Sequence, residues 1–143
     1  MTRALVRGLA VVAALALPAC GQSVFDLAVG DCLDYPQTGE EVSTVDEVAC
    51  TDPHQAEVYA LVAHSATVDE PFPGEGELTS FADEVCIDEF QGYVGVAYEQ
   101  SALFSTAFTP SAESWESEDD REIVCLLVAE EGKLTGSKRG SEE

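Results

Sequence analysis

The sequence predicts an α+β fold: a small antiparallel sheet with one main helix packed on it, stapled by two disulfides. Three observations predict it. Several short β-like runs follow one another along the chain, one segment has helical periodicity, and four cysteines remain beyond the amino-terminal region. Consecutive strands favour antiparallel pairing, and a single amphipathic helix buries its apolar face against such a sheet. A chain of 143 residues has room for one domain but hardly for two.

The amino-terminal region is typical of a lipoprotein signal peptide. Two arginines flank the start of an apolar stretch over residues 8–17, which is too short to cross about 30 Å of hydrocarbon as a helix. The stretch runs into Leu17-Pro18-Ala19-Cys20, which resembles a bacterial lipobox. We therefore expect Cys20 to carry diacylglycerol, whose two chains give a stable membrane anchor, with ordinary secretion as the alternative.

On this basis the chain divides into four parts. We predict a signal peptide over residues 1–19, a lipidated tether over 20–24, a folded domain over 25–137 and a disordered polar tail over 138–143. The domain is expected to be extracytoplasmic, on the outer face of the cell membrane.

The expected strands are short runs of alternating or continuous apolar residues. They occupy residues 25–29, 42–49, 56–63, 103–108 and 123–128. The second and third runs flank the turn Thr51-Asp52-Pro53-His54, so we expect them to be adjacent antiparallel strands. The last run is continuously apolar, which indicates the most deeply buried strand.

One segment has the three- and four-residue spacing of an amphipathic helix. Ser80 is the expected N-cap and Gly92 the expected C-terminal stop. The apolar positions that carry the spacing are Leu78, Phe81, Ala82, Val85, Cys86 and Phe90. Residues 110–115 are expected to form a turn or a short helix.

The four remaining cysteines are an even number in an oxidising compartment, which favours two disulfides. Three connectivities are possible, and we favour Cys32 with Cys50 and Cys86 with Cys125. The first pair closes a short loop, and the second joins the helix to a core strand. The rival is a zinc site built on Cys50, His54 and Cys32, but the chain has no C-x2-C pair, so we expect neither metal nor cofactor.

The charge is strongly acidic, with 28 Asp and Glu against 6 Lys and Arg and a net charge of −22. Nucleic-acid binding is excluded, because it depends on Lys and Arg that neutralise phosphates. The run Glu116, Glu118, Asp119, Asp120 and Glu122 could hold a cation, but it lacks the spacing of a dedicated calcium loop, so a solvated turn is favoured.

A series of short motifs along residues 24–139 resembles a known family. They are Val24-Phe25-Asp26-Leu27, Val29-Gly30-Asp31-Cys32, Cys50-Thr51-Asp52-Pro53-His54, Tyr93-Val94-Gly95, Ser114-Trp115, Asp120-Arg121 and Thr135-Gly136-Ser137. In this order they resemble the septum-formation domain of envelope proteins from high-GC Gram-positive, actinobacterial, organisms. One departure is Asp119, where that family more often has glycine. The resemblance implies a module linked to cell division and supplies no catalytic residues.

Two further groups of residues are singled out by their chemistry. His54 and Glu57 could form a general-base pair, but no nucleophile is indicated beside them, so His54 is expected to be a structural anchor. Arg121 is the only basic residue between Arg7 and Lys133 and precedes the buried strand. We expect it to be at least half buried, to pair with an Asp or Glu, and to anchor the Trp115 turn.

These observations predict a non-enzymatic lipoprotein that binds or scaffolds an unknown envelope or division protein. Two alternatives stay open: an envelope hydrolase that uses His54 and Glu57, and an acidic sensor of cations or wall ligands.

Overall fold

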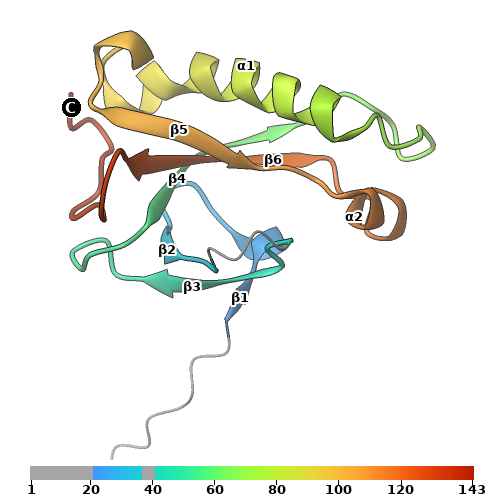
Figure 1. Ribbon diagram of the computed structural model, residues 1–143, viewed down its shortest axis with the longest axis horizontal. Helices are drawn as coiled ribbons and strands as arrows, with labels where there is room; N and C mark the ends of the chain where they lie inside the picture. Colours follow the sequence, from blue (N-terminus) through green and yellow to red (C-terminus); the bar gives the residue numbers. More distant parts are fainter. Residues whose placement is uncertain (1–20, 37–40) are drawn as a thin grey trace, which may run out of the picture.

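The computed structural model describes residues 21–36 and 41–143 and confirms the α+β class (Figure 1). The strands are β1 (Gln22–Ser23), β2 (Cys32–Asp34), β3 (Thr44–Val48), β4 (Ala56–Ala63), β5 (Leu103–Phe108) and β6 (Glu122–Ala129). The helices are α1 (Glu75–Val94) and α2 (Ala112–Ser117), with 3-10 turns η1 (Val24–Asp26) and η2 (Tyr98–Gln100). Among the described residues, no helix is both long and apolar enough to span a bilayer.

The sheet has the strand order β1-β3-β2-β4-β6-β5, and every neighbouring pair is antiparallel. The prediction that β3 and β4 are neighbours is wrong, because β2 lies between them. With only Cys32, Leu33 and Asp34, β2 is too short to show a periodic pattern. Leu33 is nonetheless fully buried, so burial rather than sequence pattern defines this strand.

Helix α1 covers one face of β4, β5 and β6 (Figure 1). A core of apolar side chains fills the space between them, and the disulfide from Cys86 on α1 to Cys125 on β6 crosses it. Its largest members are Tyr59, Phe90, Tyr93, Ile123 and Leu127.

A second core lies on the opposite face, where β1, β2 and β3 extend away from α1 (Figure 1). It contains Leu27, Leu33, Val45, Ala56, Val58, Val124 and Leu126. β4 and β6 are therefore covered on both faces. This explains why β6 is a continuous apolar run and not an alternating one.

The two disulfides join Cys32 to Cys50 and Cys86 to Cys125, which confirms the favoured connectivity. The first ties β2 to the chain just after β3. The second ties α1 to the centre of the sheet. Both close loops and so restrict the unfolded chain.

Helix α1 begins earlier than predicted. Its first residue is Glu75, after Gly74 with φ of 105°, and its first turn carries two acids, which suits the positive end of the helix dipole. Ser80 does not cap the helix. Its hydroxyl lies inside α1 and donates to the Gly76 carbonyl at 2.9 Å.

Helix α1 also ends later than predicted: its last residue is Val94, and its C-cap is Gly95 rather than Gly92. Gly95 adopts φ of 101° and its N–H donates to the Gln91 carbonyl, the usual geometry of a glycine C-cap. Continuing the helix through Gly92 costs about 1 kcal/mol relative to alanine. Burial of Tyr93 and Val94 against the sheet offsets that cost.

The described amino-terminal segment differs from the prediction in two ways. Gln22 and Ser23 form β1 against β3, so they belong to the fold and not to a tether. The predicted strand over residues 25–29 is replaced by η1, because the Ser23 side chain accepts the Phe25 N–H and closes a turn. The predicted signal peptide and the predicted lipidation site, Cys20, lie outside the described residues.

The carboxyl-terminal residues 138–143, expected to be disordered, instead lie against the end of α1. The N–H groups of Gly140 and Glu142 donate to the carbonyls of Tyr93 and Val94 at 2.8 and 3.0 Å. These carbonyls belong to the last turn of the helix, where no intrahelical donor is present. The tail therefore completes the helix end, a long-range role that its polar composition does not indicate.

Candidate functional site

His54 and Glu57 form the most deeply buried polar group of the described chain. Glu57 lies on β4, and His54 precedes that strand in a bridge with Leu134, with N–H to carbonyl distances of 3.0 and 2.8 Å. The exposed fraction of both side chains is 0%. A buried carboxylate must be compensated by hydrogen bonds, so its partners reveal its role.

The Glu57 carboxylate accepts three hydrogen bonds. Its Oε1 accepts from the Tyr93 hydroxyl and from the Ser137 hydroxyl, each at 2.6 Å. Its Oε2 accepts from the Lys138 N–H at 2.7 Å. One buried carboxylate thus joins β4, α1 and the carboxyl-terminal segment.

Tyr93 is part of the same group. Burial raises the pKa of Tyr93 to about 12, and the hydrogen bond to Glu57 acts in the same direction. The Arg139 guanidinium lies 4.6 Å from the centre of the Tyr93 ring, as in a cation–π contact. Tyr93 therefore holds the tail through its ring as well as through its backbone carbonyl.

His54 is placed by its own turn. Its Nδ1 lies 2.8 Å from the Asp52 carbonyl, so Nδ1 carries the proton and donates it. Its Nε2 is buried and has no hydrogen-bond partner among the described residues. Glu57 therefore does not orient the imidazole, and no described hydroxyl or thiol is hydrogen-bonded to it. This geometry lacks the contacts of a general-base pair.

Cys32, His54 and Glu57 place one ligand atom each within 4.8 Å of one another. However, Cys32 is bonded to Cys50, so its sulfur is not the thiolate that binds zinc. Only the imidazole and a carboxylate already occupied by three donors remain. While the disulfide is intact, these residues do not fit a zinc centre.

Trp115 and Arg121 form a second structural group at the other end of the sheet. The Trp115 indole N–H donates to the Glu70 carbonyl at 2.8 Å, and its ring is buried. The Arg121 guanidinium lies 3.6 Å from the centre of that ring and donates to the Trp115 carbonyl at 2.9 Å. It also donates to the carbonyls of Asp120, Thr67 and Val68.

Arg121 thus contacts the Trp115 turn, but the expected carboxylate partner is replaced. No Asp or Glu in the described ranges forms an ion pair with it. Five carbonyl and ring contacts fill the space around the guanidinium, and its planar fork suits several carbonyls at once.

The acidic run that precedes β6 does not form a cation cage. Asp120 accepts hydrogen bonds from the Ser114 hydroxyl and the Glu122 N–H, each at 3.0 Å. Within residues 21–36 and 41–143, its members do not bring three ligand atoms together. Asp119 has φ of 54°, a left-handed conformation that favours glycine, which explains the glycine expected there from the resemblance.

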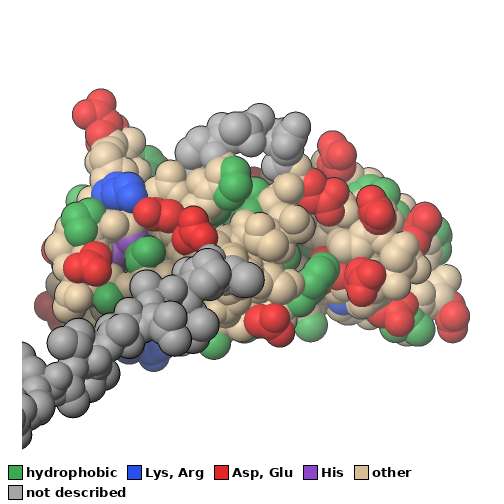
Figure 2. Space-filling model, turned by 90° about the horizontal axis from the view of Figure 1, so that it is seen from below, with side chains coloured by type: hydrophobic (Ala, Val, Ile, Leu, Met, Phe, Trp, Pro, Cys, Tyr) green, Lys and Arg blue, Asp and Glu red, His purple; other side chains and the backbone are tan. Residues whose placement is uncertain are grey.

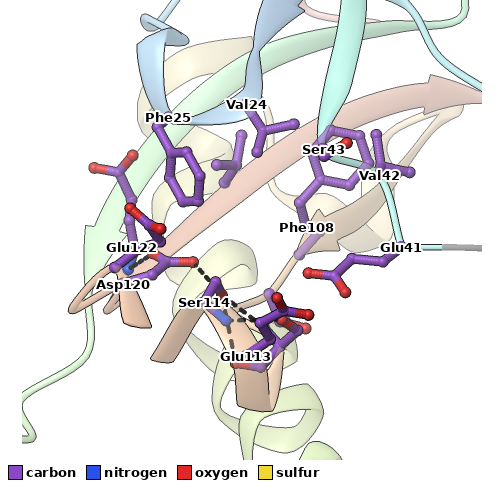
Figure 3. A pocket seen from close by; sticks show the side chains of 15 residues that line it. Val24, Phe25, Glu41, Val42, Ser43, Phe108, Glu113, Ser114, Asp120 and Glu122 are labelled. Atoms are coloured by element: carbon purple, nitrogen blue, oxygen red, sulfur yellow. Dashed lines mark hydrogen bonds between the residues drawn. The ribbon is translucent and has the colours of Figure 1, made fainter. Parts of the chain in front are cut away.

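A pocket of about 540 Å³ opens between η1, the start of β3 and α2 (Figure 3). Its floor is apolar and its edge is acidic. Val24 and Phe25 face Val42 and Phe108 across it, as Figure 3 shows. The carboxylates come from Glu41, Glu113, Glu118, Asp120 and Glu122.

None of the described residues that line the pocket is basic. Burial, together with the neighbouring Asp120 carboxylate, raises the pKa of Glu122 above its usual value. Asp and Glu also dominate the charged side chains visible in Figure 2, which views the molecule from below. The pocket therefore offers an open surface that is apolar at its floor and acidic at its edge.

Sequence reasoning found His54 and Glu57 but missed their partners. Tyr93 and Ser137 were seen only as parts of family motifs, because they lie 36 and 80 positions from Glu57. The pocket was missed altogether. The predicted tether contains Val24, and the predicted strands contain Phe25, Val42 and Phe108. Of the pocket acids, Glu118, Asp120 and Glu122 belong to the acidic run, whereas Glu41 and Glu113 were not singled out.

The family model described as "Septum formation" matches residues 29–141. That range covers most of the chain and contains the buried group, both disulfides and α2. Comparison with curated proteins and with solved structures found no match.

Proposed function

The chain belongs to the septum-formation family, and we propose that it is a non-enzymatic extracytoplasmic lipoprotein that binds or scaffolds a division or wall-assembly protein. Family membership supports a role in cell division or the envelope. The finer assignment depends on what the pocket and the buried group can do.

The observation that carries this proposal is the contrast between the pocket and the candidate catalytic pair. The pocket is open, has exposed Phe25 at its surface and is lined by carboxylates that form no ion pair with a described basic residue. His54 and Glu57 are closed to solvent, and Glu57 is engaged by three donors. An exposed apolar patch beside charged groups is typical of a binding surface, whereas a saturated buried carboxylate is typical of a structural element.

Membrane attachment is proposed through Cys20. The two disulfides favour an oxidising compartment outside the cytoplasm. Because β1 begins at Gln22, the linker to the lipid is very short and the domain stays close to the bilayer.

Membrane attachment is tested with Cys20→Ser. We expect this variant to leave the membrane fraction in detergent partitioning and to keep both disulfides, because the described fold does not include Cys20. Retention on salt-washed membranes would show that the anchor is not the lipid.

The binding role is tested by depletion and complementation. Cells that lack the parent protein are expected to place or complete septa incorrectly, and His54→Gln, checked for folding by circular dichroism, is expected to restore division. A folded His54→Gln that fails, together with release of wall fragments by the purified parent, would favour the hydrolase alternative instead.

A further inference from the structure

We propose that the pocket between η1 and α2 binds a basic, amphipathic peptide segment of a membrane-anchored partner, an inference that rests on the binding role proposed above. The segment would place apolar side chains on the floor of the pocket and Lys or Arg at its edge (Figure 3).

The floor of the pocket is apolar surface that the domain leaves uncovered. Phe25 is 53% exposed and lies outside the two apolar cores of the described domain. Val24, Val42 and Phe108 lie beside it and are only partly buried. Covering such a surface removes apolar area from water, so an apolar side chain of a partner would be stabilised there.

The edge of the pocket has no internal cation to neutralise it. The described chain has four basic residues, and each is engaged elsewhere. Arg121 contacts Trp115, Lys133 pairs with Asp34, Lys138 pairs with Glu143 and Arg139 contacts Tyr93. A complementary positive charge on a partner would therefore be favourable at this edge.

The carboxylates favour an extended cation over a metal ion. Glu41 precedes β3, Glu113 lies on α2 and Glu122 begins β6, so they approach the pocket from separate elements (Figure 3). In the described ranges they do not form a group of three ligand atoms. A peptide with several spaced positive charges matches such a distribution, and a cavity of this size accommodates several side chains.

The position of the pocket favours a partner at the membrane. Val24 and Phe25 lie four and five residues after Cys20. Five extended residues span at most about 18 Å, so a lipid on Cys20 would hold the pocket near the bilayer. The acidic surface repels anionic headgroups, so a basic protein segment beside the membrane is the favoured occupant, not the lipid itself.

The test uses the membrane-purified protein in nanodiscs of phosphatidylcholine, which is zwitterionic and has no net charge, with empty nanodiscs as the blank. Binding of three synthetic peptides of equal length is measured by fluorescence anisotropy. The first alternates Lys with Val, the second Lys with Ser and the third Glu with Val. We expect saturable binding of the Lys/Val peptide alone.

Two variants remove the two features of the pocket separately. The first variant is Phe25→Ser, and the second combines Glu113→Gln with Glu118→Gln. We expect each variant to bind the Lys/Val peptide about tenfold more weakly than the parent, the usual effect of truncating an interface contact. The matched controls are Phe104→Ser, another exposed aromatic outside the pocket, and Asp83→Asn with Glu84→Gln on α1. Both controls should bind like the parent.

Every other outcome overturns the inference. Equal binding of the Lys/Ser peptide would indicate general electrostatic attraction, and equal binding of the Glu/Val peptide would indicate apolar attraction without charge selection. Equal effects of the control variants would place the contact elsewhere. Absence of binding, in a protein whose depletion still disturbs septa, would reject this occupant and leave the binding role intact.

Discussion

The Glu57 group and the η1–α2 pocket use carboxylates in opposite ways. Glu57 is fully buried, accepts three hydrogen bonds and joins three distant parts of the chain. The pocket carboxylates are spread along an open edge, and the described basic residues lie elsewhere. The difference teaches that the role of a carboxylate depends on the hydrogen bonds it accepts. A carboxylate that accepts hydrogen bonds from several segments is structural, whereas one with few such donors is available to a partner.

The largest effect is expected at Glu57. Glu57→Ala leaves the donors of Tyr93, Ser137 and Lys138 without their acceptor, and an unpaired buried donor such as the Tyr93 hydroxyl costs about 1–3 kcal/mol. We expect the free energy of unfolding to fall by about 3 to 5 kcal/mol in urea titrations. Hydrogen exchange of the tail amides should accelerate in the same variant.

Glu84→Ala is the control for this experiment, because it removes an exposed carboxylate from α1. Its free energy of unfolding should stay within about 0.5 kcal/mol of the parent's. If Glu57→Ala is as stable as this control, Glu57 is not the structural carboxylate of the comparison.

Arg121 contacts the Trp115 ring and backbone carbonyls and forms no ion pair with the pocket carboxylates. Its loss is expected to have the next largest effect on stability. Arg121→Lys keeps the charge but loses the planar fork that reaches several carbonyls. We expect both Arg121→Lys and Arg121→Ala to lower the free energy of unfolding by about 1–3 kcal/mol, as measured by thermal melting.

Lys133→Ala provides the contrast, because it removes an exposed ion pair with Asp34 worth about 0–1 kcal/mol. A fully stable Arg121→Lys would mean that charge alone, and not the carbonyl contacts, holds the Trp115 turn.

Alkaline pH provides a smaller perturbation of the Glu57 group. The pKa of Tyr93 is raised from 10.0 to about 12, first by burial and then by Glu57. The stabilisation from the neutral hydroxyl is therefore complete below pH 10 and is lost as the pH rises towards 12. Burial also raises the pKa of Tyr59 to about 12, so both tyrosines contribute.

Circular dichroism during unfolding at pH 9 to 12 measures this loss, with the pH range set by those two pKa values. Tyr93→Phe removes one ionisable hydroxyl, so its stability should fall less steeply with pH than the parent's, although it is lower at neutral pH. Identical slopes of stability against pH in the two proteins would mean that ionisation of Tyr93 does not contribute to the loss of stability at alkaline pH.

The smallest effect on stability is expected at the pocket. Glu113→Gln combined with Glu118→Gln removes two exposed charges that no described cation pairs with. The free energy of unfolding should change by less than about 0.5 kcal/mol, with any change stabilising because repulsion falls. A clear destabilisation in urea titrations would mean that the pocket carboxylates are structural too, and the contrast with Glu57 would disappear.

Prediction from sequence succeeded where the signal is local. The continuous apolar run of β6 and the helical spacing around Phe90 identified the two elements that form the main core. The cysteine count and the expected elements led to the correct connectivity. The C-terminal end of α1 was predicted too early, because Gly92 is a local stop signal that the burial of Val94 overrides.

Prediction of the candidate site was less complete. His54 and Glu57 were recognised by residue type, but Tyr93 and Ser137 were not recognised as their neighbours. Phe25 was assigned to a strand, although η1 turns it towards the pocket. Each miss concerns residues distant in sequence whose positions depend on how the sheet is ordered.

The sequence by itself determined the acidity of this protein, the even number of cysteines after Cys20, the α+β class and the family. Only the tertiary structure decided that β2 separates β3 from β4, that the tail donates to Glu57, and that Phe25 lines the same pocket as Glu113 of α2. The reason is physical. Periodicity and residue type are local properties of the chain, whereas burial and hydrogen-bond partners are determined by contacts between segments that the fold alone brings together.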